Sequence, residues 1–175
     1  METREFTTAD IIGGLAALQG ASSAGLIVAI DISAGVMSDP AIQQYLIFDA
    51  RTTASHVKLI GSGKANPAAG RRRLAAQDET TLQNLTVTAS GQGLIVEMRN
   101  VRVEGVTGAP AVIVKDGARL IVSDCLFITN AAGAIRMLDG TLEVTDTAFT
   151  ENGAAGVRGG ALQLFNVFAS IFSSV

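Results

Sequence analysis

The sequence predicts an all-β fold, a right-handed parallel β-helix, in which short strands stack in successive turns of a solenoid. Three observations indicate this fold. A short motif recurs about every 22 residues in the second half, apolar and polar residues alternate as they do in strands, and β-branched residues are dense. Because one short strand cannot bury its apolar side alone, stacking equivalent strands is how such a sequence forms a continuous core.

The composition favours a single domain with an aliphatic core. The chain has 175 residues, of which 48% are hydrophobic but only 5% aromatic, with no tryptophan. The net charge of −3 argues against general nucleic-acid binding, and no motif indicates a cofactor. Cys125 is the single cysteine, so no intrachain disulfide can form, and we expect it to be a small buried residue on a strand.

The first 25 residues are expected to form a capping helix and a turn before the β-helix, which would occupy residues 26–175. A helix is predicted near residues 10–19 and a strand at 26–32. The 20 uncharged residues 11–30 could alternatively form a membrane-spanning helix, but their middle, LQGASSAG, is polar and turn-like, so no span is expected. No signal peptide is legible, so the protein stays inside the cell or the sequence is part of a longer precursor.

A polar insertion at about residues 61–81 separates the early strands from the repeats. It contains three consecutive arginines, Arg71, Arg72 and Arg73, and is expected to leave the coil as a loop. Such a run is most often solvated. The functional alternatives are docking onto an acidic partner or a polysaccharide, and proteolytic processing after the basic run.

The repeat places one polar residue between two apolar ones. The copies are LQNLTV, MRNVRV, VSDCLF, VTDTAF and VFASIF, with central residues Asn84, Asn100, Asp124, Asp146 and Ala169. The intervals between these central residues are 16, 24, 22 and 23. A second register in phase with the first aligns Asp116, Asp139 and Asn166. Each unit is therefore expected to contain three short strands, about 4.8 Å above the previous unit.

Stacking of the units predicts columns of like residues. Phe127, Phe149 and Phe172 are expected to stack inside the coil. Asn84, Asn100, Asp124 and Asp146 are expected to form a ladder at one corner, where side chains can bond the backbone. Asn130 and Asn152 are predicted to mark a second corner with left-handed backbone.

The stacking of Asp124 over Asp146 would bring two carboxylates together. The plain interpretation is that both point outward or cap backbone N–H groups. The alternatives are a site for a cation such as Ca²⁺ and a pair for acid–base chemistry, since like charges raise one of the two pKa values. The sequence leaves these alternatives open.

No arrangement of residues predicts a catalytic site. The candidates on an outer face are Asp49, Arg51, His56 and Lys58, and later Arg99, Arg102, Arg119 and Arg136. They supply no tight group of two aspartates and a basic residue within one turn. Metal-ligand spacing is absent, and GSGK at residues 61–64 lacks the spacing of a phosphate-binding loop.

Two motifs carry a family resemblance. FTEN at residues 149–152 followed by GGAL at 159–162 resembles the FxxN and GGA[ILV] motifs of polymorphic outer-membrane protein repeats, and FITN with AGAI at 127–135 resembles a degraded copy. HVKLIGSG and LQNLTV are similar to early turns of the pectin-lyase-like β-helix superfamily. The resemblance implies a β-helix with adhesion, surface display or assembly as its role, and an extracellular or cell-surface location.

The C-terminal segment, ALQLFNVFASIFSSV, is apolar and lacks a polar cap. We therefore expect a non-catalytic structural or interaction module that docks through its last turn, or an outer face, onto another protein chain, either a second copy or a larger assembly. A carbohydrate-active β-helix, either a polysaccharide lyase or a glycan-binding module, is the alternative, with a glycan as the second class of partner.

Overall fold

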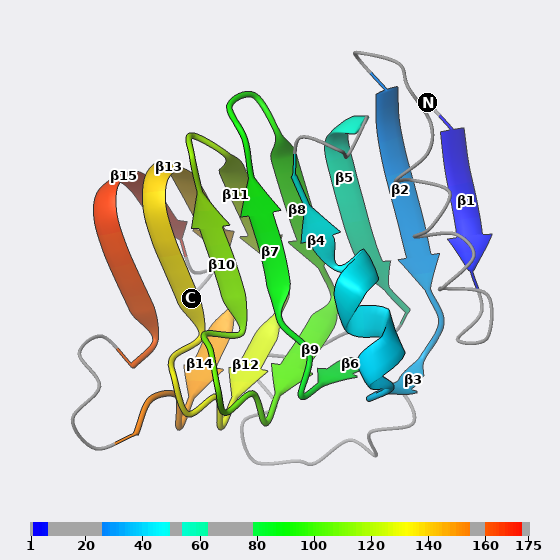
Figure 1. Ribbon diagram of the computed structural model, residues 1–175. Coiled ribbons are helices and arrows are strands. Elements are labelled where there is room, and N and C mark those ends of the chain that lie inside the picture. The colour runs from blue at the N-terminus through cyan, green and yellow to red at the C-terminus, as the bar shows by residue number, and fades with distance from the viewer. Residues whose placement is uncertain (1, 7–25, 50–53, 63–78, 155–159, 173–175) are drawn as a thin grey trace.

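The structure, a computed structural model, is a parallel β-solenoid, which confirms the predicted fold class (Figure 1). It describes residues 2–6, 26–49, 54–62, 79–154 and 160–172. The strands of the first half are β1 (Glu2–Phe6), β2 (Leu26–Ile32), β3 (Gly35–Met37), β4 (Ile47–Phe48), β5 (Ala54–Gly61), β6 (Thr80–Gln83) and β7 (Val87–Ser90). Those of the second half are β8 (Ile95–Arg99), β9 (Val101–Glu104), β10 (Val112–Lys115), β11 (Arg119–Ser123), β12 (Leu126–Ile128), β13 (Ile135–Thr145), β14 (Ala148–Thr150) and β15 (Leu162–Phe172). A 3-10 helix, η1 (Pro40–Tyr45), precedes β4.

The strands form three faces, which we number for reference. Face 1 contains β4, β7, β10 and the first parts of β13 and β15. Face 2 contains β1, β2, β5, β8, β11 and the second parts of β13 and β15. Face 3 is the five-stranded sheet of β3, β6, β9, β12 and β14. Since β13 and β15 bend from face 1 into face 2, these two faces form one continuous sheet.

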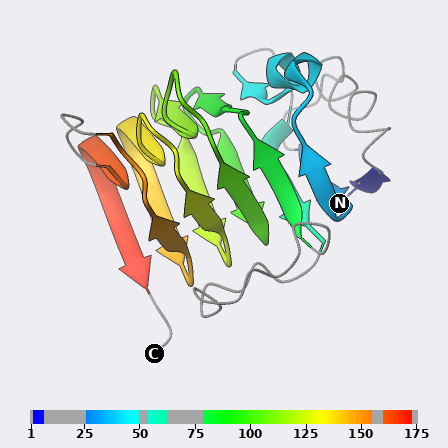
Figure 2. The same cartoon turned by 90° about the horizontal axis from the view of Figure 1, so that it is seen from below.

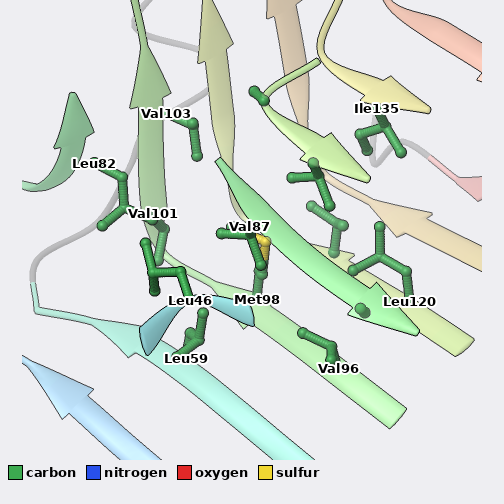
Figure 3. Packing of buried hydrophobic residues seen from close by; sticks show 14 of the residues in the cluster. Leu46, Leu59, Leu82, Val87, Val96, Met98, Val101, Val103, Leu120 and Ile135 are labelled. Carbon is green, nitrogen blue, oxygen red and sulfur yellow. The ribbon is translucent and has the colours of Figure 1, made fainter. Parts of the chain in front are cut away.

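The core lies between the three faces. Alternate residues point inward in strands such as β8, where Val96 and Met98 are fully buried. Figure 3 shows labelled side chains from strands of all three faces converging on this interior. The fully buried residues are aliphatic apart from a few such as Phe48 and Phe127, as the composition predicts.

Left-handed backbone occurs at each corner of the solenoid. Asn100, Asp124 and Asp146 have φ of 54°, 52° and 47°, at the corner between faces 2 and 3. Asp116, Asp139 and Asn166 have φ of 58°, 62° and 55°, at the corner between faces 1 and 2. Asparagine and aspartate tolerate this conformation better than other non-glycine residues, so the repeated polar residue makes the sharp turn.

Asn84 lies at a different corner from the one predicted. It follows β6 on face 3, and its N–H donates to the Glu104 carbonyl of the next turn. Gly105 and Thr129 occupy the equivalent positions, since their N–H groups donate to the carbonyls of Ile128 and Thr150. The prediction of a single four-residue ladder was therefore wrong for Asn84. The interval of 16 residues from Asn84 to Asn100 is shorter than one full turn by about one strand, which is the sequence signal for this difference.

The phenylalanine column contains two of its three predicted members. Phe127 and Phe149 are in register, with ring centroids 5.2 Å apart and planes 10° from parallel. Phe172 is placed elsewhere, because β15 continues along β13 for 11 residues and aligns Phe172 with Thr145. The prediction for Phe172 was wrong, since the repeat alignment set Ala169 level with Asp146, whereas in the structure Ala169 pairs with Leu142 in the middle of the strand.

The N-terminal predictions are tested in part. The predicted strand at 26–32 is β2. A strand at residues 2–6, β1, pairs with it and was not foreseen. The predicted helix at 10–19 lies outside the described residues. So do residues 63–78 of the insertion, including Arg71, Arg72 and Arg73, whereas Thr80 and Thr81 already belong to β6. In the described part of the chain no helix has the length and apolarity to cross a membrane.

Candidate functional site

The C-terminal strand, β15, exposes the largest apolar side chains that the structure describes. Phe165, Phe168, Ile171 and Phe172 are 56%, 85%, 57% and 64% exposed. We call these four residues together the C-terminal patch. Phe168 and Phe172 share the outward side of face 2, Phe165 lies on face 1, and Ile171 is level with the buried Val144 at the open end of the core. Exposed apolar side chains gathered at one end of a molecule are typical of a surface that is covered in an assembly.

The outward positions of face 2 change character at β15. Phe168 is in register with Thr141, and Thr141 with Arg119. Phe172 is in register with Thr145. The two preceding turns, β11 and β13, thus carry polar or charged residues where β15 carries phenylalanine, so the outer surface of the last turn is more apolar than that of the two turns before it.

The inner side of β15 is incompletely covered as well. Leu162, Leu164 and Val167 pack against the core but are only partly buried. Among the described strands β15 pairs with β13 alone, and it forms one end of the stack (Figure 2). Its other edge therefore presents backbone N–H and C=O groups, which is a template for a further strand.

A charged cluster lies on face 2, on the neighbouring strands β5 and β8 in the middle of the stack. The Glu97 carboxylate on β8 is 2.9 Å from Nζ of Lys58 and 3.1 Å from Nε2 of His56, both on β5. Burial raises the pKa of the Glu97 carboxyl, but the hydrogen bond and charge of Lys58 and the charge of His56 outweigh it. The net pKa lies below its usual value of 4.5. His56 and Lys58 therefore share one carboxylate.

Substitution Glu97→Gln is expected to lower the free energy of unfolding by at most about 1 kcal/mol at pH 7, because the pair is only partly buried. The folded-state pKa of Glu97 is below the unfolded value of 4.5, so its stabilisation is present above pH 4.5 and is lost as the pH falls through the folded-state pKa. Urea titrations at pH 7 and pH 3 measure this. A difference between the two proteins that persists undiminished at pH 3 would contradict the assignment.

A second cluster lies on face 3. Nε and Nη2 of Arg102 lie 2.7 and 2.6 Å from Oε2 of Glu104, and Gln83 donates to the other oxygen of Glu104 at 3.2 Å. Glu79 is buried, with Oε2 3.8 Å from Nη1 of Arg102 and without a hydrogen bond. The guanidinium of Arg102 is thus held by carboxylates of its own sheet.

The other candidates from the sequence are dispersed. Arg119 pairs with Glu143, and Nε of Arg99 lies 3.7 Å from Oδ2 of Asp124. Arg136 is exposed on face 1, Asp49 follows β4, and Arg51 lies outside the described residues. Among the described members of this set, His56 and Lys58 are brought together at Glu97.

The glutamates that complete these clusters were missed by sequence reasoning. Lys58 and Glu97 are direct neighbours across two strands, but 39 positions apart in the chain. The insertion between β5 and β6 hides this register. The pairing of Arg119 with Glu143 could have been predicted from the sequence. Aligning the VSD and VTD repeats sets Arg119 level with Thr141, so Glu143 lies two residues further along the adjacent strand.

Cys125 is fully buried, and burial raises the pKa of its thiol to about 12. Its Sγ lies 3.2 Å from the Ser123 carbonyl oxygen. It sits at the corner just after Asp124 rather than on a strand. A neutral, enclosed thiol of this kind is a packing residue.

Neither metal-binding geometry nor a known relative identifies a site. Within the described ranges no three His, Cys, Asp or Glu residues come together as metal ligands. Comparison of the chain with protein-family models, with curated proteins and with solved structures found no match in any of the three. The C-terminal patch is therefore the feature on which a functional argument can be built.

Proposed function

We propose that this chain is a non-catalytic structural module that joins another protein chain through its C-terminal turn. The observation that carries the proposal is the replacement of polar outward residues by exposed phenylalanines on β15. A strand added to the free edge would bond its backbone groups and cover the aromatic side chains together. Such a role needs a rigid scaffold and no reactive groups.

The charged clusters support a structural role. The basic side chains of Lys58, Arg102 and Arg119 are each engaged by a carboxylate of an adjacent strand or of their own strand. Ion pairs of this kind stabilise a surface only slightly and leave these three cations already paired rather than poised for a substrate carboxylate. They are what a solvated outer face of a solenoid requires.

The motif resemblance suggests the kind of assembly in which the module takes part. FxxN and GGAL resemble the repeats of polymorphic outer-membrane proteins, within a broader likeness to the pectin-lyase-like superfamily. In the proposed role the module takes part in adhesion or assembly at an extracellular or cell surface. The Asn152 and Gly160 backbones of these motifs are in close contact, since a Cβ on Gly160 would lie 2.3 Å from the Asn152 oxygen.

Substitution Phe168→Lys is expected to weaken association of the purified chain at least about tenfold, because a charged side chain would replace an aromatic one inside the interface. Size-exclusion chromatography with light scattering measures this. The matched control is Val36→Lys, which changes another exposed apolar side chain, on β3. Equal association of the two variants would refute docking through the C-terminal turn.

A further inference from the structure

We infer that the partner at the C-terminal turn is a second copy of this chain, joined through antiparallel pairing of the two β15 strands about a twofold axis. This inference rests on the proposed function. Three observations support it: the backbone groups at the free edge of β15, the polarity of the two ends of the stack, and the order of side chains on β15.

The free edge of β15 offers specific backbone groups on face 2. The Phe172 carbonyl accepts from the Asp146 N–H at 3.1 Å and so points toward the rest of the molecule. In a strand, the N–H and C=O of one residue point to the same neighbouring strand, and those of the next residue point to the opposite side. Because Phe172 points toward β13, Ala169 and Ile171 direct their N–H and C=O groups to the free edge. These two residues can form the hydrogen-bonded pairs with an added strand.

The two ends of face 2 differ in polarity. At the N-terminal end β1 is the outermost described strand, with Arg4 in register with the buried Ile30 and Glu2 in register with Val28. The sequence of this edge strand, ETREF, carries three charged residues, and charged residues in an edge strand discourage addition of an apolar strand. Stacking β15 of one copy on β1 of another is therefore unfavourable, whereas β15 against β15 joins two apolar ends.

The residue order of β15 is self-complementary in one antiparallel register. With Ser170 opposite Ser170 of the second copy, Ala169 faces Ile171 as a hydrogen-bonded pair. Phe168 then faces Phe172 twice, as non-hydrogen-bonded pairs, whose side chains approach most closely. Outward residues lie opposite outward residues and inward ones opposite inward ones, as an antiparallel pair requires.

The exposed apolar surface of β15 supplies more than half of the area that a dimer interface buries on each partner. From typical aromatic areas, the C-terminal patch exposes about 500 Å², and Leu162, Leu164 and Val167 add to it. A stable interface buries about 800 Å² per partner. Because the contact is isologous, it closes at two copies.

Disulfide cross-linking tests the axis. Ser170→Cys is expected to convert most of the protein into a disulfide-linked dimer on mild oxidation, because opposed Cβ atoms in such a pair are about 4.5–5.5 Å apart. The matched control is Glu143→Cys, in the same column one strand earlier. Its two copies would be about 14 Å apart, with three strand spacings between them, and should not cross-link. The unmodified chain controls for Cys125, which is buried.

The outcomes separate this inference from the proposed function. A Ser170→Cys dimer with no larger species supports both. Self-association that Phe168→Lys weakens, but that gives no Ser170→Cys cross-link or grows beyond a dimer with concentration, overturns the twofold arrangement and leaves the proposed function standing. A chain that remains monomeric at every concentration and does not cross-link overturns the inference of a second copy, whereas self-association that Phe168→Lys and Val36→Lys affect equally overturns both.

Discussion

Substitution Gly140→Ala is expected to lower the free energy of unfolding by about 3 kcal/mol or more. Gly140 has φ of 131°, a conformation that residues with a Cβ rarely adopt. An added Cβ would lie 2.2 Å from the carbonyl oxygen of Ala118 on the turn before. That oxygen also accepts a hydrogen bond from the Thr141 N–H at 3.3 Å, and Ala118 is fully buried, so the neighbouring turn cannot withdraw.

The matched control for this prediction is Gly108→Ala. An added Cβ there meets no atom within 4 Å, and the φ of Gly108 is not positive. The change in free energy should stay within about 0.5 kcal/mol. Urea unfolding followed by circular dichroism gives both values. Equal midpoints for the two variants would show that the turns are not packed at the spacing described here.

Substitution Asn130→Leu is expected to lower the free energy of unfolding by about 3–5 kcal/mol. The buried Asn130 side chain accepts from the Val106 N–H at 3.1 Å and donates to the Val103 carbonyl at 3.1 Å and to Oδ1 of Asn152 at 2.8 Å. Leucine has similar volume but leaves these three groups without their partner. Buried polar groups without hydrogen bonds are costly.

Asn84→Gly serves as the control for Asn130. Asn84 is exposed with φ of 57°, a conformation that glycine adopts freely, so little change in stability is expected. Thermal unfolding of the two variants beside the unmodified chain measures the difference. A loss of stability at Asn130 no greater than that at Asn84 would contradict an interior asparagine ladder.

Asn130 and Asn152 also show what the sequence pattern could and could not predict. The FxxN repeat predicted a corner with left-handed backbone at these residues. The left-handed residues are instead Thr129 and Glu151, each with φ of 53°. The asparagines follow them, and the amide of Asn130 turns into the core. The left-handed conformation can shift by one residue in every copy while the spacing between the copies stays the same. The repeat spacing therefore does not show which residue of the turn is left-handed.

The solenoid itself was predictable because its cause is local. Each turn needs short alternating strands and residues that tolerate sharp corners, and both leave a direct mark on the sequence. Contacts between turns are less legible, as Lys58 and Glu97 show, because their register depends on the length of the intervening insertion. The course of β15 was missed because the motif VFASIF was aligned with the corner repeat, whereas the structure follows the second register, in which Asn166 is level with Asp139 and Ala169 pairs with Leu142.

Sedimentation velocity on the unmodified chain over a wide concentration range tests most directly whether two copies pair through the C-terminal turn. We predict a reversible change from the 18.0 kDa monomer to a dimer as concentration rises. A compact monomer at every concentration would mean that the exposed phenylalanines of β15 do not mediate self-association, and would contradict the account.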